Sequence, residues 1–528
     1  MKQLLILMIL AVTVQLFGGN WIFGESIGGP DMERIWDIQS DSESNLFITG
    51  EFVSDLLIGG QSINGMGLSD TFVAKYDCDG GLKWCNALCS LSDTAGLGVG
   101  TDADGNCYVG GYFMGTMFCQ GDSVVSNGLW DAYVAKFDPE GTLLWLRSFG
   151  SPMNDIVHGL CVNAAGDVFA GGWFAETMDC GDGSSLTSYG GSDTFVIAMN
   201  QSGDTLWARQ GGSPGVSYGY KVACDNAGNS YLTGVAGAGA VFGNFSLPGG
   251  MFVTKYDAQG NEIWALPTSN AMVISISCMT DAAEGQQGMV AGRLTGNGSF
   301  GEFSFATVAG SSDYYWASFD AESGTWLDLQ VHGGSGDDRG RDCSFDNGPA
   351  VVGTISENTI FMGENLISAG GDDIVIYDPG LGIIQEGGEY SEVPYAICHM
   401  PNGCLAIAGW HFGSFMLDSG PLNSGNEANQ NGFMAIYSPA NAAEDEVQSP
   451  PILKCYPNPF TEQITVKGYR ANKLKVYNMK GQLVRAIDRV DKDSFVWDGR
   501  DTHGGHLSPG IYLIRSGGQL SRVIKLAN

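Results

Sequence analysis

The sequence has few charged residues, and basic residues are the scarcest of them. Charged residues make up 16% of its 528 residues, and 25 Lys and Arg stand against 58 Asp and Glu, a formal net charge of −33. Because phosphate contacts need a basic surface, this balance excludes a nucleic-acid-binding protein. Hydrophobic residues still make up 44%, which is enough for a sizeable core.

Long apolar segments are missing beyond the N-terminus. Residues 4–17 follow Lys2 and are almost entirely apolar, and Gly18 and Gly19 supply the small residues of a cleavage site. The run is short for a membrane span, so residues 1–19 are predicted to be a signal peptide and the mature chain to have no transmembrane span. A retained anchor is the alternative, because the cleavage site lacks the Ala-x-Ala form.

Motifs of catalysis and metal binding are also scarce. The six histidines are scattered, and no Gly-x-Ser-x-Gly, phosphate-binding loop or His-Glu-x-x-His occurs. His503 and His506 lack a third ligand. The segment DADGN from Asp102 imitates a calcium loop, but Phe113 replaces its final Glu, which favours a hairpin turn. We therefore predict no catalytic residue, no metal site and no cofactor, with calcium kept as the alternative.

The 13 cysteines form an odd number, so at least one is unpaired. Four occupy one equivalent position in successive repeats: Cys161, Cys224, Cys343 and Cys398. A second position holds Cys119, Cys180, Ile58 or Leu417. Positions of this kind are predicted to be buried and apolar, because free cysteine packs as a small hydrophobe. Cys78 and Cys85 flank one turn and are the candidate disulfide.

Glycine is abundant, at 79 residues, and the chain repeats itself. Similar phrases end at Trp84, Trp145, Trp207, Trp264 and Trp326, with spacings of 61, 62, 57 and 62 residues. Each phrase has an alternating apolar run, an Asp/Asn-x-x-Gly turn and a second apolar run, which is a hairpin signature. Another hairpin precedes each phrase, so every copy offers four strands, and seven copies can be aligned.

Seven units of four strands predict an all-β fold, a seven-bladed β-propeller over residues 20–439. The first copy begins with WIFGES from Trp21, which matches the closing strand WLRSFG from Trp145. The seventh copy lacks that strand after GFMAIYSP. We therefore predict that residues 21–26 pair with residues 433–437, so that the N-terminal strand closes the last blade and leaves no open edge.

Two segments carry a family resemblance, GGSGDDRGRDCSFDNG from Gly333 and SPMNDIVHGLCVNAAGDVFAGG from Ser151. Their Gly-rich opening, acidic residue, short strand and Gly-ended strand resemble the bacterial propeller repeats called SBBP, over roughly residues 21–440. The resemblance implies the fold and little about activity, because propellers host many unrelated functions.

The last residues form a different unit. Residues 440–453 are rich in Ala, acids and Pro, as expected of a linker. Residues 454–528 carry a net charge of +7, whereas the preceding residues carry −40. Six short alternating segments predict a small immunoglobulin-like β-sandwich here.

An ordered motif runs through this tail. Its members are Tyr456, Pro457, Asn458, Pro459, Phe460, Gly481, Trp497, Asp498, Gly499, Gly510, Tyr512 and Lys525. Asp498 and Gly499 predict a turn, and Gly510 predicts a close backbone approach. The motif resembles the type A C-terminal sorting domain of type IX secretion cargo. That resemblance implies recognition by an outer-membrane translocon and export to the surface of a Gram-negative bacterium, anchored or released; a purely structural module is the alternative.

Acidic residues recur at one repeat position, namely Asp70, Asp131, Asp193 and Asp313. In a propeller they would form a ring able to bind cations or sugar hydroxyls, but capping of a turn or strand backbone is favoured. The sequence thus predicts a secreted surface module that binds or adheres to a glycan or protein ligand. The alternatives are a polysaccharide hydrolase or lyase using acids at one mouth, and a passive surface-layer protein.

Overall fold

The computed structural model describes residues 19–268, 271–279, 287–308, 310–345, 349–424 and 429–439, and in the tail 454–456, 460–461, 463–467, 473–478, 483–488, 494–502, 504–516 and 519–526. Every regular element in these ranges is a β-strand, which confirms an all-β chain. The chain divides into two units, residues 1–442 and 443–528. The predicted signal peptide, except Gly19, and the predicted linker lie outside the described residues.

The strands of the first unit pair antiparallel in groups of four, as the repeat predicted. The first group is β2 (Glu33–Ser40), β3 (Leu46–Phe52), β6 (Asp70–Tyr76) and β7 (Leu82–Ser90). The second is β8 (Thr94–Thr101), β9 (Cys107–Cys119), β10 (Asp122–Phe137) and β11 (Leu143–Phe149). The third is β12 (Ile156–Val162), β13 (Val168–Phe174), β16 (Asp193–Met199) and β17 (Thr205–Gly212). The fourth is β18 (Tyr218–Cys224), β19 (Ser230–Ala236), β22 (Gly250–Tyr256) and β23 (Glu262–Pro267).

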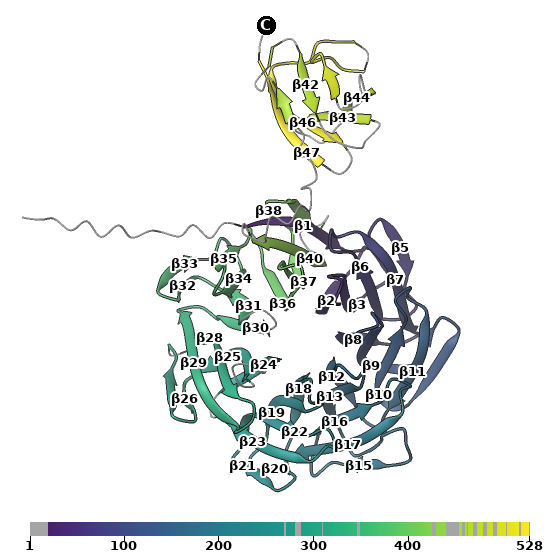
Figure 1. The fold of residues 1–528 in the computed structure, drawn as a ribbon, viewed down its shortest axis with the longest axis vertical. Helices are drawn as coiled ribbons and strands as arrows, with labels where there is room; N and C mark the ends of the chain where they lie inside the picture. The colour runs from purple at the N-terminus through teal and green to yellow at the C-terminus, as the bar shows by residue number, and fades with distance from the viewer. Residues whose placement is uncertain are drawn as a thin grey trace, which may run out of the picture. The chain divides into compact units, whose positions relative to one another are not determined.

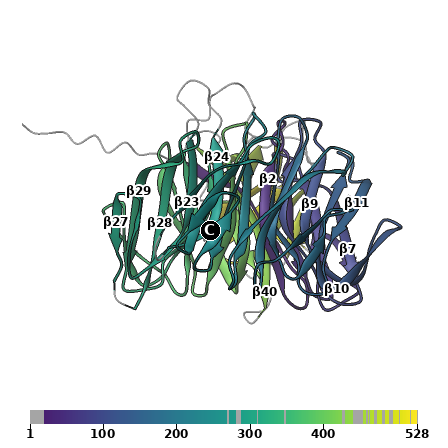
Figure 2. The same cartoon turned by 90° about the horizontal axis from the view of Figure 1, so that it is seen from below.

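The remaining groups follow the same order. The fifth is β24 (Ala271–Met279), β25 (Gln287–Thr295), β28 (Ser312–Asp320) and β29 (Thr325–Gly334). The sixth is β30 (Arg339–Ser344), β31 (Ala350–Ile355), β34 (Asp373–Asp378) and β35 (Gly382–Glu386). The last is β36 (Glu392–His399), β37 (Leu405–Phe412), β40 (Gln430–Pro439) and the N-terminal strand β1 (Gly19–Ile27). In Figure 1 the first strand of each group lies innermost, and Figure 2 shows the strands running between two end faces.

The N-terminal strand completes the last group, as predicted. Trp21 pairs with Tyr437 and Ser26 with Phe433. The alignment behind that prediction was wrong by two residues, however. Phe23 lies opposite Ile436 in the way that Trp145 lies opposite Lys136, because both strands shift register beside these residues. Phe23 therefore takes the place of the repeated tryptophan.

Short extra hairpins, which the sequence prediction missed, lie between the second and third strands. They are β4–β5 (Asp55–Ile58, Gln61–Asn64), β14–β15 (Thr177–Asp179, Ser185–Thr187), β20–β21 (Ala240–Phe242, Phe245–Leu247), β26–β27 (Asn297–Phe300, Phe303–Ala306), β32–β33 (Asn358–Phe361, Glu364–Ile367) and β38–β39 (Ser414–Leu417, Gly420–Asn423). In the second group the ends of β9 and β10 form this hairpin. Ile58, Cys119, Cys180 and Leu417 are buried at these hairpins, which confirms that their shared position is apolar.

Successive groups are joined by one repeated contact between an aromatic ring and a turn. The indole Nε1 of Trp145 donates to the carbonyl of Gln201 at 3.0 Å. Gly203 ends this turn with φ +77°, and a Cβ there would lie 3.0–3.2 Å from the indole ring. Trp84, Trp207 and Trp264 meet Gly141, Gly260 and Gly324 in the same way, and Phe23 meets Gly80. We call this contact the ring–turn clasp.

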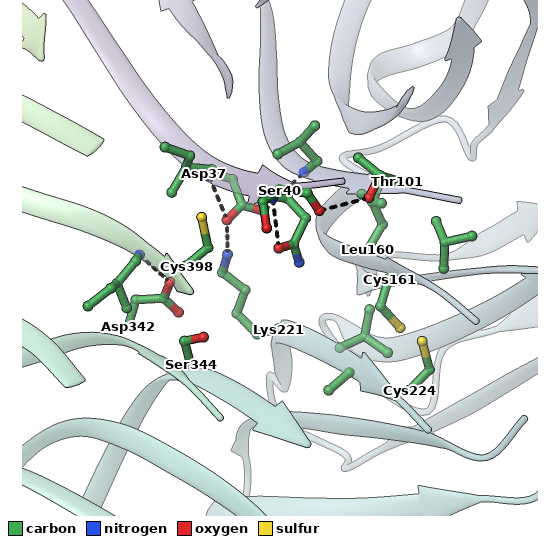
Figure 3. Close-up of a pocket in the computed structure, with 18 of the residues that line it drawn as sticks. Asp37, Ser40, Thr101, Leu160, Cys161, Lys221, Cys224, Asp342, Ser344 and Cys398 are labelled. Carbon is green, nitrogen blue, oxygen red and sulfur yellow. Dashed lines mark hydrogen bonds and ion pairs between the residues drawn. The ribbon is translucent and has the colours of Figure 1, made fainter. Parts of the chain in front are cut away.

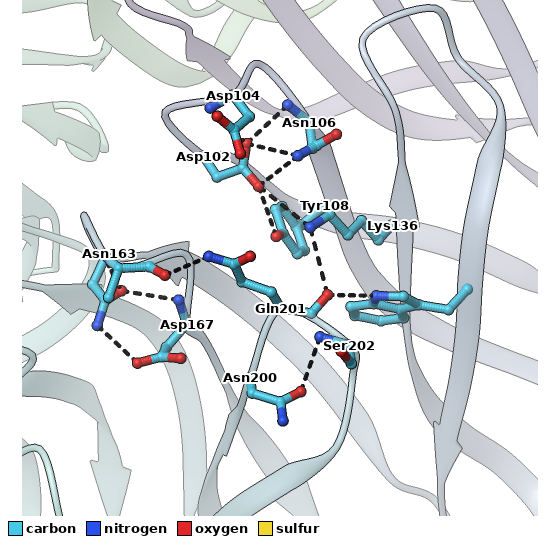
Figure 4. A network of polar contacts seen from close by, with 12 residues as sticks. Asp102, Asp104, Asn106, Tyr108, Lys136, Asn163, Asp167, Asn200, Gln201 and Ser202 are labelled. Carbon is cyan, nitrogen blue, oxygen red and sulfur yellow. Dashed lines mark hydrogen bonds and ion pairs between the residues drawn. The ribbon is translucent and has the colours of Figure 1, made fainter.

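The loop that imitates a calcium site is a turn of the same network (Figure 4). The Asp102 carboxylate accepts hydrogen bonds from the Asp104 and Asn106 amides at 3.1 and 3.0 Å and from the Tyr108 hydroxyl at 2.9 Å. Lys136 Nζ lies 3.4 Å from Asp102 Oδ2 and 3.5 Å from the carbonyl of Gln201, to which it donates a hydrogen bond. The hairpin-turn interpretation is therefore confirmed.

The tail unit consists of two sheets that share one apolar core. One sheet contains β41 (Lys454–Tyr456), β42 (Ile464–Lys467) and β45 (Ser494–Trp497). The other contains β44 (Leu483–Asp488), β43 (Lys473–Asn478), β46 (Gly510–Ser516) and β47 (Gln519–Lys525). Val466 and Trp497 from the first sheet pack with Val476 and Ile514 from the second. The six predicted strands are present, and β41 is an addition.

The ring–turn clasp between Phe23 and Gly80 predicts a measurable stability difference. Gly80 has φ +83°, and a Cβ there would lie 2.2 Å from the Phe23 ring, whereas Gly183 has φ +85° with nothing within 4 Å of its Cβ position. We expect Gly183→Ala to cost about 1 kcal/mol of backbone strain. Gly80→Ala should cost about 1–2 kcal/mol more, because the ring must also move. Denaturant unfolding would measure both free energies, and equal costs would contradict the clasp between the first and last groups.

Candidate functional site

A cavity of about 300 Å³ lies between the innermost strands of the first unit (Figure 3). The lining comes from β2, β8, β12, β18, β30 and β36. Its polar side chains include Asp37, Lys221 and Asp342, with the hydroxyls of Ser40 and Ser344. Because these strands come from different groups, the cavity exists only when the groups stand together.

An ion pair crosses this cavity. Lys221 Nζ donates to Asp37 Oδ1 at 3.0 Å, which joins β18 to β2. Burial lowers the pKa of Lys221, but the carboxylates of Asp37 and Asp342 outweigh it, so its pKa lies above the ordinary value. Asp37 Oδ2 also accepts a hydrogen bond from the Val99 amide, and Asp342 Oδ2 accepts one from the Ile397 amide. These side chains therefore hold neighbouring first strands together.

Four cysteines line the same cavity. Cys343 and Cys398 are buried, as predicted, but Cys161 and Cys224 are half-buried, so the prediction is wrong for this pair. Cys161 and Cys224 pack only at the margin of one apolar cluster, so part of each side chain stays exposed to the cavity.

The predicted disulfide is absent, since Cys78 and Cys85 are free thiols. Cys85 lies opposite Ala74 on β6. Cys78 comes after Ala74, in the turn that follows β6, so the hairpin register separates the two cysteine side chains. Both instead pack against the apolar core around Tyr76.

Every innermost strand with described side chains carries a β-bulge, which the sequence prediction missed. A bulge inserts an unpaired residue and re-aims its side chain. The inserted residues are Trp36, Leu97, His158, Tyr220, Arg341 and Tyr395. We call this set the bulge collar. Its only sequence signal is a break in the alternation of a short strand.

The side chains of the collar touch one another between groups. The Trp36 and Tyr395 rings lie 4.5 Å apart between centroids, and those of His158 and Tyr220 lie 5.6 Å apart. The Arg341 guanidinium carbon lies 5.2 Å from the Tyr395 ring centroid, within cation–π range. All five side chains are half-buried, so each presents some surface to solvent.

More aromatic rings surround the collar. Tyr112, Trp130 and Trp173 are half-buried and pack with Trp36 against the apolar cluster around Leu97. The ring centroids of Tyr112 and Trp130 are 4.8 Å apart. Half-exposed aromatic rings at one place are typical of ligand sites, because they offer flat apolar area at low entropic cost.

The four predicted acids lie elsewhere, near the start of the third strand in their groups. Asp70, Asp131, Asp193 and Asp313 are at most 6% exposed, and none lines the cavity. The first three accept backbone hydrogen bonds: Asp70 from Ser90, Asp131 from Asn127 and Asp193 from Ser213. These contacts of Asp70, Asp131 and Asp193 agree with the favoured interpretation, in which the carboxylates cap the backbone.

A second acid faces several of these positions from the next group. Burial, with a smaller contribution from the neighbouring Asp155, raises the pKa of Asp131 to about 7. Burial and the neighbouring Asp338 raise the pKa of Asp313 to about 6. Burial raises the pKa of Glu392 to about 8, with Asp373 adding to the effect. Deprotonation therefore puts unfavourable charge at the junctions between groups.

These raised pKa values predict a pH dependence of stability. A carboxyl whose folded pKa lies above its unfolded value contributes stability below the unfolded pKa and loses it as pH rises through the folded pKa. We therefore expect the unfolding temperature to fall between pH 5 and pH 8. Glu392→Gln should reduce this fall, and Glu389→Gln, at an exposed position, should leave it unchanged. Scanning fluorimetry at each pH would measure it; identical profiles for both variants would contradict the assignment.

The sorting motif converges in the tail unit. The Trp497 ring lies 5.3 Å from those of Phe460 and Tyr512, and Lys525 is also buried. Gly499 has φ +67°, and a Cβ there would lie 2.5 Å from the Lys525 side chain, so Asp498 and Gly499 form the predicted bend.

Other motif positions are less informative. The predicted close backbone approach at Gly510 is wrong, because a Cβ there would meet nothing within 4 Å. Tyr456 lies on β41, and Pro457, Asn458, Pro459, Gly481 and His503 fall outside the described residues. Within the described ranges no three His, Cys, Asp or Glu side chains gather as a metal site.

The comparisons with known proteins identify the tail. Residues 454–526 match the family model described as the secretion system C-terminal sorting domain. A curated relative, the uncharacterized WD repeat-containing protein L264 of Acanthamoeba polyphaga mimivirus, is 22% identical over 231 residues. That match covers 37% of this chain and only 17% of the relative.

Similar solved structures are distant. A protein of unknown function from Bacteroides caccae is 10% identical, with 64% of this chain and 96% of that chain covered and a TM-score of 0.33. The intramolecular trans-sialidase of Ruminococcus gnavus is 8% identical, with 77% and 94% covered and a TM-score of 0.29. PorZ, a type IX secretion component of Porphyromonas gingivalis, is 10% identical, with 95% and 100% covered and a TM-score of 0.16.

The sorting domain defines the destination of the protein. It is exported by the type IX secretion system, interacts with that machinery and is attached at the outer surface of a Bacteroidetes-type bacterium. Among the described residues, no helix is long and apolar enough to cross a membrane.

Export should depend on the packing of the sorting motif. Gly499→Ala places a methyl group against the Lys525 side chain. Gly504 also has a positive φ, +84°, but a methyl group there would meet nothing within 4 Å, so Gly504→Ala is the matched control. We expect Gly499→Ala to reduce surface display and Gly504→Ala to preserve most of it, while deletion of residues 454–528 should leave the protein in the periplasm. Protease accessibility on intact cells would measure display, and full display of the deletion variant would contradict the role of the tail.

Proposed function

We propose that residues 20–439 form a closed seven-bladed β-propeller of the SBBP type, in which each four-stranded group is a blade. The pairing of β1 with β40 supports closure, since it joins the first residues of the unit to its last strand. The contact of Phe23 with Gly80 supports it as well, because it links the last group to the first. Closure in this way leaves no incomplete group with an open edge at β40.

On this ring we propose a binding or adhesion module whose ligand is a glycan held at the bulge collar. The observation that carries the proposal is the pair of half-buried rings of Trp36 and Tyr395, which meet across the adjacent innermost strands β2 and β36, with Tyr220 half-buried on the innermost strand β18. Such rings offer flat faces to the apolar faces of sugars. A module attached to the outer cell surface would meet polysaccharides there.

The contacts favour binding over hydrolysis. A glycosidase needs two carboxyl groups that flank a substrate bond. The paired acids Asp131 and Asp155, and likewise Asp373 and Glu392, are at most 1% exposed. Asp131, Asp373 and Glu392 accept backbone hydrogen bonds from the loops around them. A polysaccharide hydrolase or lyase is therefore the second candidate, because these buried acid pairs are not placed to flank a substrate bond.

Binding to a panel of polysaccharides, with product detection, would test the function. We expect Trp36→Ala and Tyr395→Ala each to weaken retention about tenfold, the effect of about 1.4 kcal/mol from a well-packed aromatic contact. Tyr189→Ala, at an exposed ring outside the collar, should bind as the wild type does.

The other outcomes separate the alternatives. Product formation would establish an enzyme. Retention of a protein partner that survives both collar substitutions would place the ligand elsewhere. No retention by the wild type would favour a passive surface-layer protein.

A further inference from the structure

Arginines gather at the bulge collar although the sequence before residue 454 has a net charge of −40. Arg341 belongs to the collar and lies over the Tyr395 ring, and Arg34 lies 5.7 Å from the Trp36 ring centroid. Burial lowers the pKa of Arg341, and the positive charges of Arg339 and Arg293 lower it further. The backbone also brings Arg341 and Arg293 together, because a Cβ at Gly340 would lie 2.7 Å from the amide nitrogen of Gly292.

Three lysines of this unit have anionic partners. Lys75 lies 3.7 Å from Asp41, Lys136 lies 3.4 Å from Asp102, and Lys221 lies 3.0 Å from Asp37. These pairs neutralise the buried ammonium groups, as burial of charge requires.

Arg341 of the collar and the neighbouring Arg293 differ. Within the described ranges, no hydrogen bond or ion pair engages the guanidinium of Arg341 or Arg293, and the buried Nε of Arg341 has no acceptor. The charge of Asp372 raises the pKa of Arg341, and burial raises the pKa of Asp372 against the lowering effect of Arg339 and Arg341. A buried guanidinium beside like charges is stabilised when an anion supplies the missing acceptors.

We propose that Arg341, with Arg293 beside it, binds the carboxylate or sulfate of an acidic saccharide whose ring lies against Tyr395 and Trp36. The inference rests on the proposed function and adds the chemical class of its ligand. A guanidinium fits either oxyanion, because its planar donors form two parallel hydrogen bonds. The aromatic rings bind the sugar face, and the arginines select its charge.

The test uses matched polymers and the whole mature protein. Polygalacturonate is compared with its methyl ester for the carboxylate, and dextran sulfate with dextran for the sulfate. The variants are Arg341→Met, Arg341→Lys and the charge-matched control Arg147→Met on β11, where the Arg147 guanidinium donates to the carbonyls of Gly203 and Ser202 in the turn between β16 and β17. Dissociation constants are measured by calorimetry at low and high NaCl.

We expect the wild type to bind one acidic polymer at least tenfold more tightly than its neutral counterpart, less so at high NaCl. Arg341→Met should abolish that preference, Arg341→Lys should keep part of it, and Arg147→Met should keep all of it. The polymer pair that shows the preference identifies carboxylate or sulfate. If Arg341→Met fails to fold, a partial loss of the preference for the acidic polymer in Arg341→Lys supports the proposal.

Equal binding of acidic and neutral polymers by the wild type, or an unchanged preference in both Arg341 variants, would overturn the inference. Failure of the proposed function looks different. In that case Trp36→Ala and Tyr395→Ala would leave the binding of every polymer, neutral or acidic, at the level of the wild type.

Discussion

The first unit depends on the contact between an aromatic ring on the outer strand of one group and a glycine turn of the next. The indole of Trp145 both donates a hydrogen bond to that turn and covers Gly203, which has a positive φ. A side chain at this glycine would strain the backbone and meet the ring at once. The repeated Trp of one group and the Asp/Asn-x-x-Gly turn of the next therefore form a single contact. Because both recur at regular intervals along the chain, they place successive groups at regular intervals as well.

The same joints determine where charge is tolerated. Lys136 and Lys221 lie beside carboxylates that already bind backbone amides. The Lys221–Asp37 pair joins two groups, whereas Lys136 pairs with Asp102 of its own group and reaches the next group through the carbonyl of Gln201. The paired acids at other junctions have no cation and retain protons instead, as their raised pKa values imply. An acidic protein can bury such groups because a protonated carboxyl carries no charge to desolvate.

Much of the fold could be predicted because the same pattern of strands and turns occurs in seven copies. Alternation, turn residues and the missing seventh closing strand together predicted the pairing of β1 with β40. The two-residue error at Trp21 arose because a single phrase without a partner copy does not fix register, and Phe23 fills the ring position equally well. The extra hairpins have strands of only three or four residues, too short for a periodic signal.

The candidate site escaped prediction for a different reason. Acids were sought because they recur at one repeat position, but recurrence reflects a structural need that every group shares, and Asp70 and Asp193 meet that need by binding backbone amides. A ligand site must instead break the repeat. At the bulge position the residue type changes from group to group, with Trp36, Arg341 and Tyr395 among the residues found there. The bulge supplies an unpaired residue whose side chain the sheet does not need, so variation there costs little stability and is free to serve binding.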